Sequence, residues 1–253
     1  MNPEIMVPQW PIPANIRALI TIRAGGVSEG QYDSFNLAAH VGDKPEHITR
    51  NRQQLYQVVG KKIQWLQQIH GTDVIELVKN EPNTEPIVAD GVYSSVLGSV
   101  CAVLTADCLP ILLCSNKGDW VAALHCGWRG LAAGIIERTL AKANVAADEL
   151  MAYLGPAISQ RNFEVGKDVF EAFQAAAQTR AFATPVSNFF AAAKEQNKFY
   201  ADLYGLARSE LAGLGVPAVY GGDSCTYNEA EKFYSYRRDG SCGRMASLIW
   251  IQE

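Results

Sequence analysis

The sequence predicts a single α+β domain that spans residues 1–253. Three observations favour this fold class. Short apolar runs of strand length end at turns, most clearly within Cys101–Arg129. Other stretches, such as 45–59 and 203–214, repeat their apolar residues at helical spacing. No internal repeat, long linker or change in composition divides the chain.

The first half of the chain is expected to combine strands with one long helix. Pro45 suits the first turn of that helix, which runs to Val59 and ends at Gly60. Strands at Ile63–Ile69 and Val74–Val78 are expected to form a hairpin around a turn that begins at His70. The other expected elements are a strand at Leu19–Ile22, a polar loop at 32–43 whose length favours a functional role, and a polar linker at Lys79–Pro86.

The second half is expected to alternate strands and helices. Two apolar runs within Cys101–Arg129 predict buried strands, one ending near Cys108 and the other at His125. A glycine turn then leads into a helix with Leu131, Ile135 and Leu140 on one side. The remaining expected elements are a strand at Met151–Leu154, helices around 169–177 and 203–214, and closing strands at Phe233–Tyr236 and Ala246–Ile251.

The composition is that of a soluble globular protein and excludes several classes of function. Hydrophobic residues make up 48% of the chain and charged residues 19%. A net charge of −4 offers no basic surface, so no nucleic-acid partner is expected. From 91 to 116 the only charged residue is Asp107, but Pro110 and that buried charge argue against a membrane helix. No membrane partner is expected.

The cysteines predict a reducing compartment. The six are Cys101, Cys108, Cys114, Cys126, Cys225 and Cys242. They lack the spacing of a disulfide framework or a zinc ribbon, and four of them lie in or beside apolar runs. The N-terminus has neither the basic nor the apolar region of a secretory signal. Free thiols and a cytoplasmic location are therefore expected.

Three residues at the ends of apolar runs could form a metal site. His70, Cys108 and His125 are far apart in the sequence, so only folding can bring them together. Two imidazoles and a thiolate suit Zn²⁺ and leave a fourth position open. The same atoms also fit a cysteine nucleophile with a histidine base. A third interpretation is purely structural, with a turn cap, a small buried thiol and a core histidine.

Charged residues near the ends of the apolar runs, and an arginine cluster near the C-terminus, could take part in substrate binding or catalysis. The turn from His125 to Gly130 could bind an anion through Arg129, or it could be a glycine turn with a solvated arginine. Asp90 and Asp107 could act in acid–base chemistry, orient a histidine or cap turns. Arg237, Arg238 and Arg244 could attract an anionic substrate or form a solvated face.

Six motifs resemble the YfiH-like family, whose members are also called purine nucleoside phosphorylases, laccase-like polyphenol oxidases or peptidoglycan editing factors. In order they are Gln68-x-His70-Gly71, Ala89-Asp90-Gly91, Thr105-Ala106-Asp107-Cys108-x-Pro110, His125-x-Gly127-Trp128-Arg129-Gly130, Gly155-Pro156-Ala157-Ile158 and Phe233-x-Ser235-Tyr236-Arg237-Arg238. The resemblance runs from about Val7 to Trp250.

The resemblance implies a fold and a site. It implies a layered β-sandwich flanked by helices, similar to the catalytic domain of cytotoxic necrotizing factor toxins. It implies zinc, or alternatively copper, held by the residues His70, Cys108 and His125. The residues expected to act in catalysis are Cys108, His125 and Asp107, and those expected to contact substrate are Arg52, Gln68, Arg129 and Arg237. Cys126 stands where relatives often have alanine, so it is a possible additional ligand.

The activity that the resemblance implies is phosphorolysis of purine nucleosides. Adenosine, inosine and 5′-methylthioadenosine would react with phosphate to give the base and a ribose 1-phosphate, with adenosine deamination alongside. The chain lacks the H-x-E…P-C-x-x-C signature, so deamination would need another layout. One alternative is a cysteine or zinc amide hydrolase that edits a UDP-linked peptidoglycan precursor. Another is a copper-dependent polyphenol oxidase, although four histidines are few for a multicopper cluster. A monomer or homodimer is expected.

Overall fold

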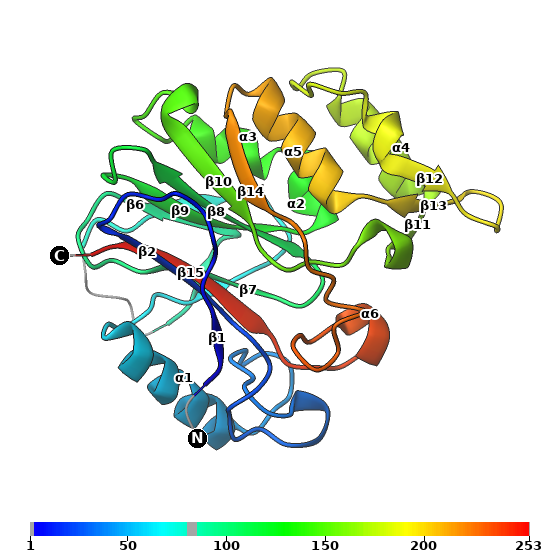
Figure 1. Cartoon of the computed structure of the whole chain (residues 1–253). Coiled ribbons are helices and arrows are strands. Elements are labelled where there is room, and N and C mark those ends of the chain that lie inside the picture. The colour runs from blue at the N-terminus through cyan, green and yellow to red at the C-terminus, as the bar shows by residue number, and fades with distance from the viewer. Residues whose placement is uncertain (1–2, 80–84, 253) are drawn as a thin grey trace.

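Two β-sheets packed face to face form the centre of the protein (Figure 1). The computed structural model describes residues 3–79 and 85–252. One sheet has the order β1-β2-β15-β7, with β1 at Ile5–Met6, β2 at Ile16–Thr21, β15 at Met245–Ile251 and β7 at Cys101–Thr105. The other has the order β14-β10-β8-β9-β6-β4, formed by Ala218–Gly221, Leu150–Leu154, Leu109–Ser115, Val121–Cys126, Gly91–Ser94 and Val74–Glu76.

Strand β8 shows why this region is apolar on both faces. Leu112 and Cys114 point between the two sheets, while Ile111 and Leu113 point towards the helices on the other side. All seven residues of β8 are buried. Because successive side chains of a strand alternate between faces, a strand covered on both sides reads as one apolar run. Burial between layers therefore explains the nearly uncharged stretch from 91 to 116.

Helices cover both outer faces and complete a four-layer arrangement. Helix α1 (Pro45–Val59) packs Leu55 and Val59 against the four-stranded sheet. The other face is covered by α2 (Trp128–Ala133), α3 (Ile135–Leu140), α4 (Lys167–Ala176) and α5 (Leu203–Gly213). Smaller elements are β3 (Leu66–Gln67) paired with β5 (Ile87–Val88), the sheet of β11 (Glu164–Gly166), β13 (Lys198–Ala201) and β12 (Phe190–Ala192), and α6 (Tyr236–Asp239). The described residues also include 3₁₀ turns at Gly30–Tyr32, Ala147–Glu149, Gln160–Asn162 and Val186–Phe189.

The predicted hairpin around His70 is wrong. β3 pairs in parallel with β5, whereas β4 pairs in parallel with β6 at the edge of the six-stranded sheet. The turn that carries His70 therefore joins two different sheets. Local sequence did not reveal this, because strands with a short turn between them usually pair with each other.

Three further expectations also need correction. The predicted strand at Phe233–Tyr236 is absent, and the Ser235 hydroxyl instead caps α6 by accepting a hydrogen bond from the Arg238 backbone. The expected helix after His125 is divided into α2 and α3 at Gly134, whose φ of 94° is left-handed. The segment Cys101–Arg129 holds three strands rather than two, because β8 follows Cys108 directly.

The mixed α/β architecture is confirmed, including helix α1 and the layered sheets. The likeness to the toxin domain and the assignment of all 253 residues to one domain stay predictions, and the expected linker at Lys79–Pro86 lies largely outside the described residues. Among the helices of the described ranges, none is both long and apolar enough to cross a membrane.

Candidate metal centre and active site

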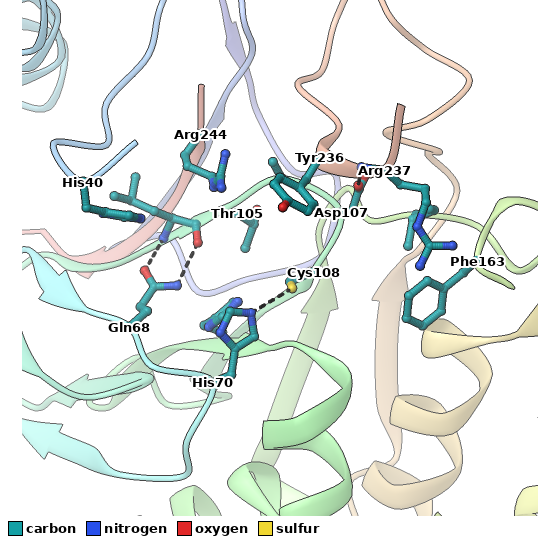
Figure 2. A pocket seen from close by; sticks show the side chains of 14 residues that line it. His40, Gln68, His70, Thr105, Asp107, Cys108, Phe163, Tyr236, Arg237 and Arg244 are labelled. Carbon is teal, nitrogen blue, oxygen red and sulfur yellow. Dashed lines mark hydrogen bonds between the residues drawn. The ribbon is translucent and has the colours of Figure 1, made fainter. Parts of the chain in front are cut away.

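Three segments bring His70, Cys108 and His125 together at one end of the space between the sheets. His70 lies on the turn between β3 and β4, Cys108 between β7 and β8, and His125 within β9. Their potential ligand atoms all lie within 4.8 Å of one another. The Cys108 Sγ is 3.7 Å from the His70 Nε2 (Figure 2), and the two imidazole rings lie 4.7 Å apart, centre to centre. The structure thus assembles the predicted group of donors.

Asp90 holds both histidines in place. Its buried carboxylate lies 2.7 Å from the His125 Nδ1, and its backbone oxygen accepts a hydrogen bond from the His125 backbone. The same carboxylate accepts backbone hydrogen bonds from Ile69, His70 and Gly71 at 2.7 to 3.1 Å. A carboxylate behind a histidine fixes the orientation of the ring and leaves the Nε2 free for a ligand. Asp90 therefore positions His125 through its imidazole ring and His70 through its backbone N–H.

The backbone around the donors is crowded. His70 and Asp107 adopt left-handed φ values of 60° and 83°, which non-glycine residues rarely occupy. A Cβ on Gly127 would lie 2.8 Å from the His70 ring and 3.0 Å from the Cys108 Sγ. Only glycine fits there without moving a donor, which explains the glycine directly before α2.

The charges in this group favour a thiolate. Burial raises the pKa of Cys108, but His125 and His70 outweigh it and lower the pKa to about 6. Burial lowers the pKa of His125, but Cys108 and Asp90 outweigh it and raise the pKa to about 9. Burial likewise raises the pKa of Asp90, and hydrogen bonds from His125 and Gly71 hold it below its usual value. Cys108 and His125 therefore stabilise each other as an ion pair.

The donor set fits a small, borderline-soft ion. A tetrahedral zinc with Zn–S of about 2.3 Å and Zn–N of about 2.0 Å requires about 3.5 Å between sulfur and nitrogen ligands. The observed Sγ–Nε2 distance of 3.7 Å agrees with that value. Three protein donors with a fourth position open to a cavity are the arrangement of a catalytic rather than a structural zinc site.

Cys126 does not join the donors. It follows His125 in β9, so its side chain points to the opposite face, where it is buried against the helix layer. Burial and the nearby Glu210 raise the pKa of Cys126 well above its usual value. It is therefore a neutral core thiol.

A cavity of about 390 Å³ opens beside the donors. Its remaining wall carries two arginines, Arg237 and Arg244, together with His40 and the Asp107 carboxylate (Figure 2). In the described part of the chain, no carboxylate forms an ion pair with either arginine. Their side chains donate hydrogen bonds to the backbone oxygens of Glu164, Cys242 and Gly243 and to the Cys242 Sγ. Phe163 and Tyr236 add aromatic surface, and the Tyr236 side chain is 60% exposed. The cavity therefore suits an aromatic ligand together with an anion.

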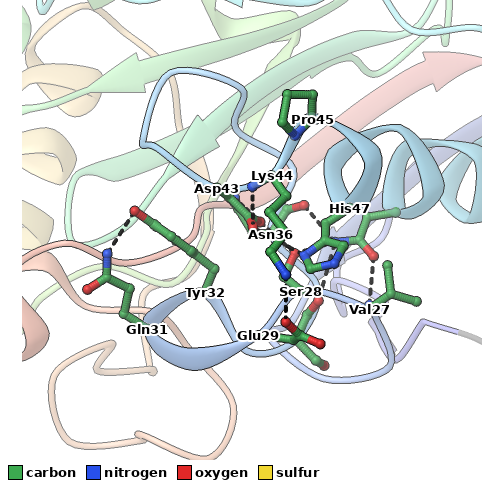
Figure 3. A network of polar contacts seen from close by, with 12 residues as sticks. Val27, Ser28, Glu29, Gln31, Tyr32, Asn36, Asp43, Lys44, Pro45 and His47 are labelled. Carbon is green, nitrogen blue, oxygen red and sulfur yellow. Dashed lines mark hydrogen bonds and ion pairs between the residues drawn. The ribbon is translucent and has the colours of Figure 1, made fainter.

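A buried polar network holds the loop that supplies His40. Asp43 accepts hydrogen bonds from the Ser28 hydroxyl at 2.6 Å and from the Asn36 amide at 3.0 Å (Figure 3). The Asn51 amide donates to the Asn36 backbone, and the Asn36 side-chain oxygen accepts from the Arg244 backbone at 3.0 Å. Asn36 therefore links this loop to a cation of the cavity wall.

The other predicted substrate residues lie in different surroundings. The Gln68 side chain exchanges two 2.7 Å hydrogen bonds with the Leu104 backbone at the cavity edge. Asp107 lines the cavity, and its carboxylate accepts from the Thr226 hydroxyl and the Arg237 backbone. Arg129 is exposed, stacks 4.4 Å from the Trp128 ring and does not line the cavity. Arg52 lies in a neighbouring cavity. The roles of these residues in substrate binding stay predictions.

Sequence reasoning missed His40 and Phe163 as cavity residues. His40 belongs to the polar loop at 32–43 that the sequence marked as functional, so the loop was identified without its side chain. Phe163 comes from the turn before β11, where an isolated aromatic residue carries no local signal.

Comparisons with known proteins agree along nearly the whole chain. The family model described as "Multi-copper polyphenol oxidoreductase laccase" matches residues 17–252. A purine nucleoside phosphorylase YfiH from Shigella flexneri is 48% identical over 250 residues, covering 98% of this chain and 99% of that protein. A purine nucleoside phosphorylase from Pseudomonas aeruginosa is 45% identical, with 98% of each chain covered.

Solved structures share the same architecture. A protein from Neisseria meningitidis superposes with a TM-score of 0.92 at 47% identity, covering 98% of this chain and 99% of that one. The protein YlmD from Geobacillus stearothermophilus gives a TM-score of 0.87 at 28% identity, covering 95% and 93%. By its sequence and its fold, the chain belongs to the YfiH family.

Proposed function

We propose that this protein is a zinc-dependent purine nucleoside phosphorylase that acts on adenosine, inosine and 5′-methylthioadenosine. The observation that carries the proposal is that a metal-type donor group and the two arginines Arg237 and Arg244 line one cavity. Its volume of about 390 Å³ falls within the range of about 300–1,000 Å³ for small-molecule sites. The names of the two phosphorylase relatives support the same activity.

The residues of the chain can be given roles in this reaction. His70, Cys108 and His125 would hold zinc, which supplies Lewis-acid chemistry at that end of the cavity. Arg237 and Arg244 would bind phosphate and stabilise negative charge as the glycosidic bond breaks. Tyr236 and Phe163 offer surfaces for the purine ring. Asp107 would hold Arg237 in place through its backbone hydrogen bond.

The deciding experiment is incubation with adenosine in the presence and absence of phosphate. Adenine and ribose 1-phosphate are expected only when phosphate is present, and hypoxanthine or inosine would reveal the proposed deaminase side activity. Arg244→Gln is expected to raise the KM for phosphate, whereas the exposed Arg138→Gln serves as the matched control. The same measurement on Arg129→Gln decides whether that side chain contributes. Adenine release that is independent of phosphate would refute the phosphorylase.

Amide hydrolysis by Cys108 is a second candidate, favoured by one observation. A thiol with a pKa of about 6 beside two imidazoles is also the arrangement of a cysteine nucleophile. Alkylation of Cys108 that abolishes activity while the metal stays bound would favour a cysteine amide hydrolase. One such enzyme would edit a UDP-linked peptidoglycan precursor. Metal analysis tests the zinc assignment directly, and about one copper per chain instead of zinc would favour the polyphenol oxidase.

A further inference from the structure

A second cavity of about 340 Å³ adjoins the catalytic one. It is called the Arg52 cavity here, after its cation, and its walls also include Trp65 and Pro86. His40, Gln68 and Leu104 line both cavities, so the two share one wall. In Figure 2 His40 and Gln68 lie on the side of the catalytic cavity opposite Phe163 and Arg237. The Arg52 cavity therefore extends the catalytic cavity away from the arginine of α6.

Arg52 is a partly buried cation without a charged partner. Its Nε donates to the Leu37 backbone at 3.0 Å, and its guanidinium carbon lies 4.4 Å from the centre of the Trp65 ring. Within the described residues no carboxylate forms an ion pair with it, and burial lowers the pKa of the guanidinium. Removing a cation from water without a counter-charge is costly, so an anion in this cavity would be strongly favoured.

The guanidinium is also held rigidly. Trp65 is buried, and its Nε1 donates to the Tyr56 hydroxyl at 2.9 Å, which fixes the ring against which Arg52 stacks. A fixed, planar fork of N–H donors suits the oxygens of a phosphoryl group. His40 adds a second basic group, although desolvation and the charges of Arg244 and Arg52 lower its pKa.

The shared wall determines how an anion could reach Arg52. Gln68 uses both ends of its amide on the Leu104 backbone, so this side chain is held in place at the boundary that the two cavities share. The phosphate that attacks a sugar in the catalytic cavity must lie next to that sugar, in the same cavity. The attacking phosphate also has cations of its own in Arg237 and Arg244. Arg52 is therefore available to bind an anionic group other than the attacking phosphate.

We propose that the Arg52 cavity binds a phosphoryl group carried by the ligand itself, whose nucleoside part lies in the catalytic cavity. Nucleoside phosphates then bind more tightly than the corresponding nucleosides and compete with them. The inference rests on the proposed function in one respect, because it takes the nucleoside to occupy the catalytic cavity. Arg52 and Trp65 thereby set the preference between neutral and phosphorylated ligands.

The test is equilibrium binding to the full-length, zinc-loaded protein, measured by calorimetry at constant ionic strength with adenosine, adenosine 5′-phosphate, adenosine 5′-diphosphate and inorganic phosphate. At least one of the two nucleotides is expected to bind about 10- to 100-fold more tightly than adenosine, which is the contribution of a charge-assisted hydrogen-bonded pair. In Arg52→Gln that ratio falls to about 1, while Arg52→Lys keeps part of it and the surface control Arg138→Gln keeps all of it.

Equal affinities for adenosine and both nucleotides in the unaltered protein would overturn the proposal, as would an unchanged ratio in Arg52→Gln. Binding of inorganic phosphate alone that depends on Arg52, without tighter nucleotide binding, would also overturn it and assign the cavity to free phosphate. Because binding is measured without turnover, a failure of phosphorolysis does not alter this result. Conversely, phosphate-dependent adenine release with no nucleotide preference would leave the proposed function standing without this inference.

Discussion

Cys108 lies directly before β8 and Cys126 ends the adjoining strand β9, yet the surroundings of the two thiols differ completely. Cys126 pairs with Leu109, the residue directly after Cys108. Cys108 faces two imidazoles, which lower its pKa to about 6, whereas burial and Glu210 raise the pKa of Cys126 well above its usual value. The comparison shows that the face of the strand and the nearby charges determine the reactivity of a cysteine here, more than its position along the chain.

The largest effect is expected from removing the thiol of Cys108, which is a proposed metal ligand, whereas the thiol of Cys126 is not. Cys108→Ala removes the only sulfur among the three donors and is expected to lower both bound zinc and catalytic activity by about 10³-fold or more. Elemental analysis and nucleoside turnover measure these quantities. Zinc retained at one ion per chain in Cys108→Ala would contradict the assignment of the site.

The second prediction concerns alkylation of the metal-free protein. At pH 7 a thiol with a pKa of about 6 is roughly 90% ionised, whereas a thiol with an unperturbed or raised pKa is only a few per cent ionised or less. The lowered pKa means that the thiolate forms as pH rises, so the rate at Cys108 is expected to increase from pH 5 to 7 and then level off. Mass spectrometry of iodoacetamide-treated protein locates the modified residue. If the alkylation rate of Cys108 reached half of its maximum only above pH 8, the expected difference in pKa between Cys108 and Cys126 would be contradicted.

The third prediction tests the Asp90 carboxylate, which contacts His125 on the face of β9 opposite Cys126. Asp90→Asn keeps the shape of the side chain but removes its charge, and zinc affinity is expected to fall by about 10- to 100-fold. Competition with a chromogenic chelator measures the affinity. Since Asp90 also holds the turn of His70, circular dichroism of the variant should accompany the titration. A native-like spectrum with unchanged affinity would show that Asp90 has no role in tuning the donors.

The smallest effect is expected from substituting Cys126, whose side chain lies on the face of β9 that packs against the helices. Cys126→Ala is expected to leave zinc content and turnover unchanged and to lower the free energy of unfolding by about 1 kcal/mol, because a small buried side chain is lost. Denaturant unfolding measures the stability. A severalfold loss of zinc would mean that the thiol of Cys126 reaches the donors after all.

Helix α1 and the buried strands could be predicted from the sequence because their signals are local. Pro45 and Gly60 mark the ends of α1, and the uncharged run around β8 marks a strand covered on both faces. The strand predicted at Phe233–Tyr236 failed because the Ser235 cap and contacts with Asp107 outweigh the aromatic pattern. The hairpin at His70 failed because strand pairing depends on partners distant in the sequence.

The metal donors could be named in advance, but the rest of the site could not. Residue types and the family motifs identified His70, Cys108 and His125, and the structure brings them within reach of one ion. The cavity wall depends on segments that are far apart in the chain, so no spacing in the sequence reveals that His40, Phe163 and Arg244 share it. The separation of Arg52 from this wall by Gln68 and Leu104 likewise arises only from packing.

The contacts of Asp90 determine how the site responds to movement of the sheet. One carboxylate holds the ring of His125 and the backbone of the turn at His70, so both donors follow Asp90 when β6 shifts. Substitutions that displace the sheet as a whole therefore move the two donors together and preserve their separation. The spacing of the two donors is therefore set within one small cluster of contacts rather than by the whole scaffold.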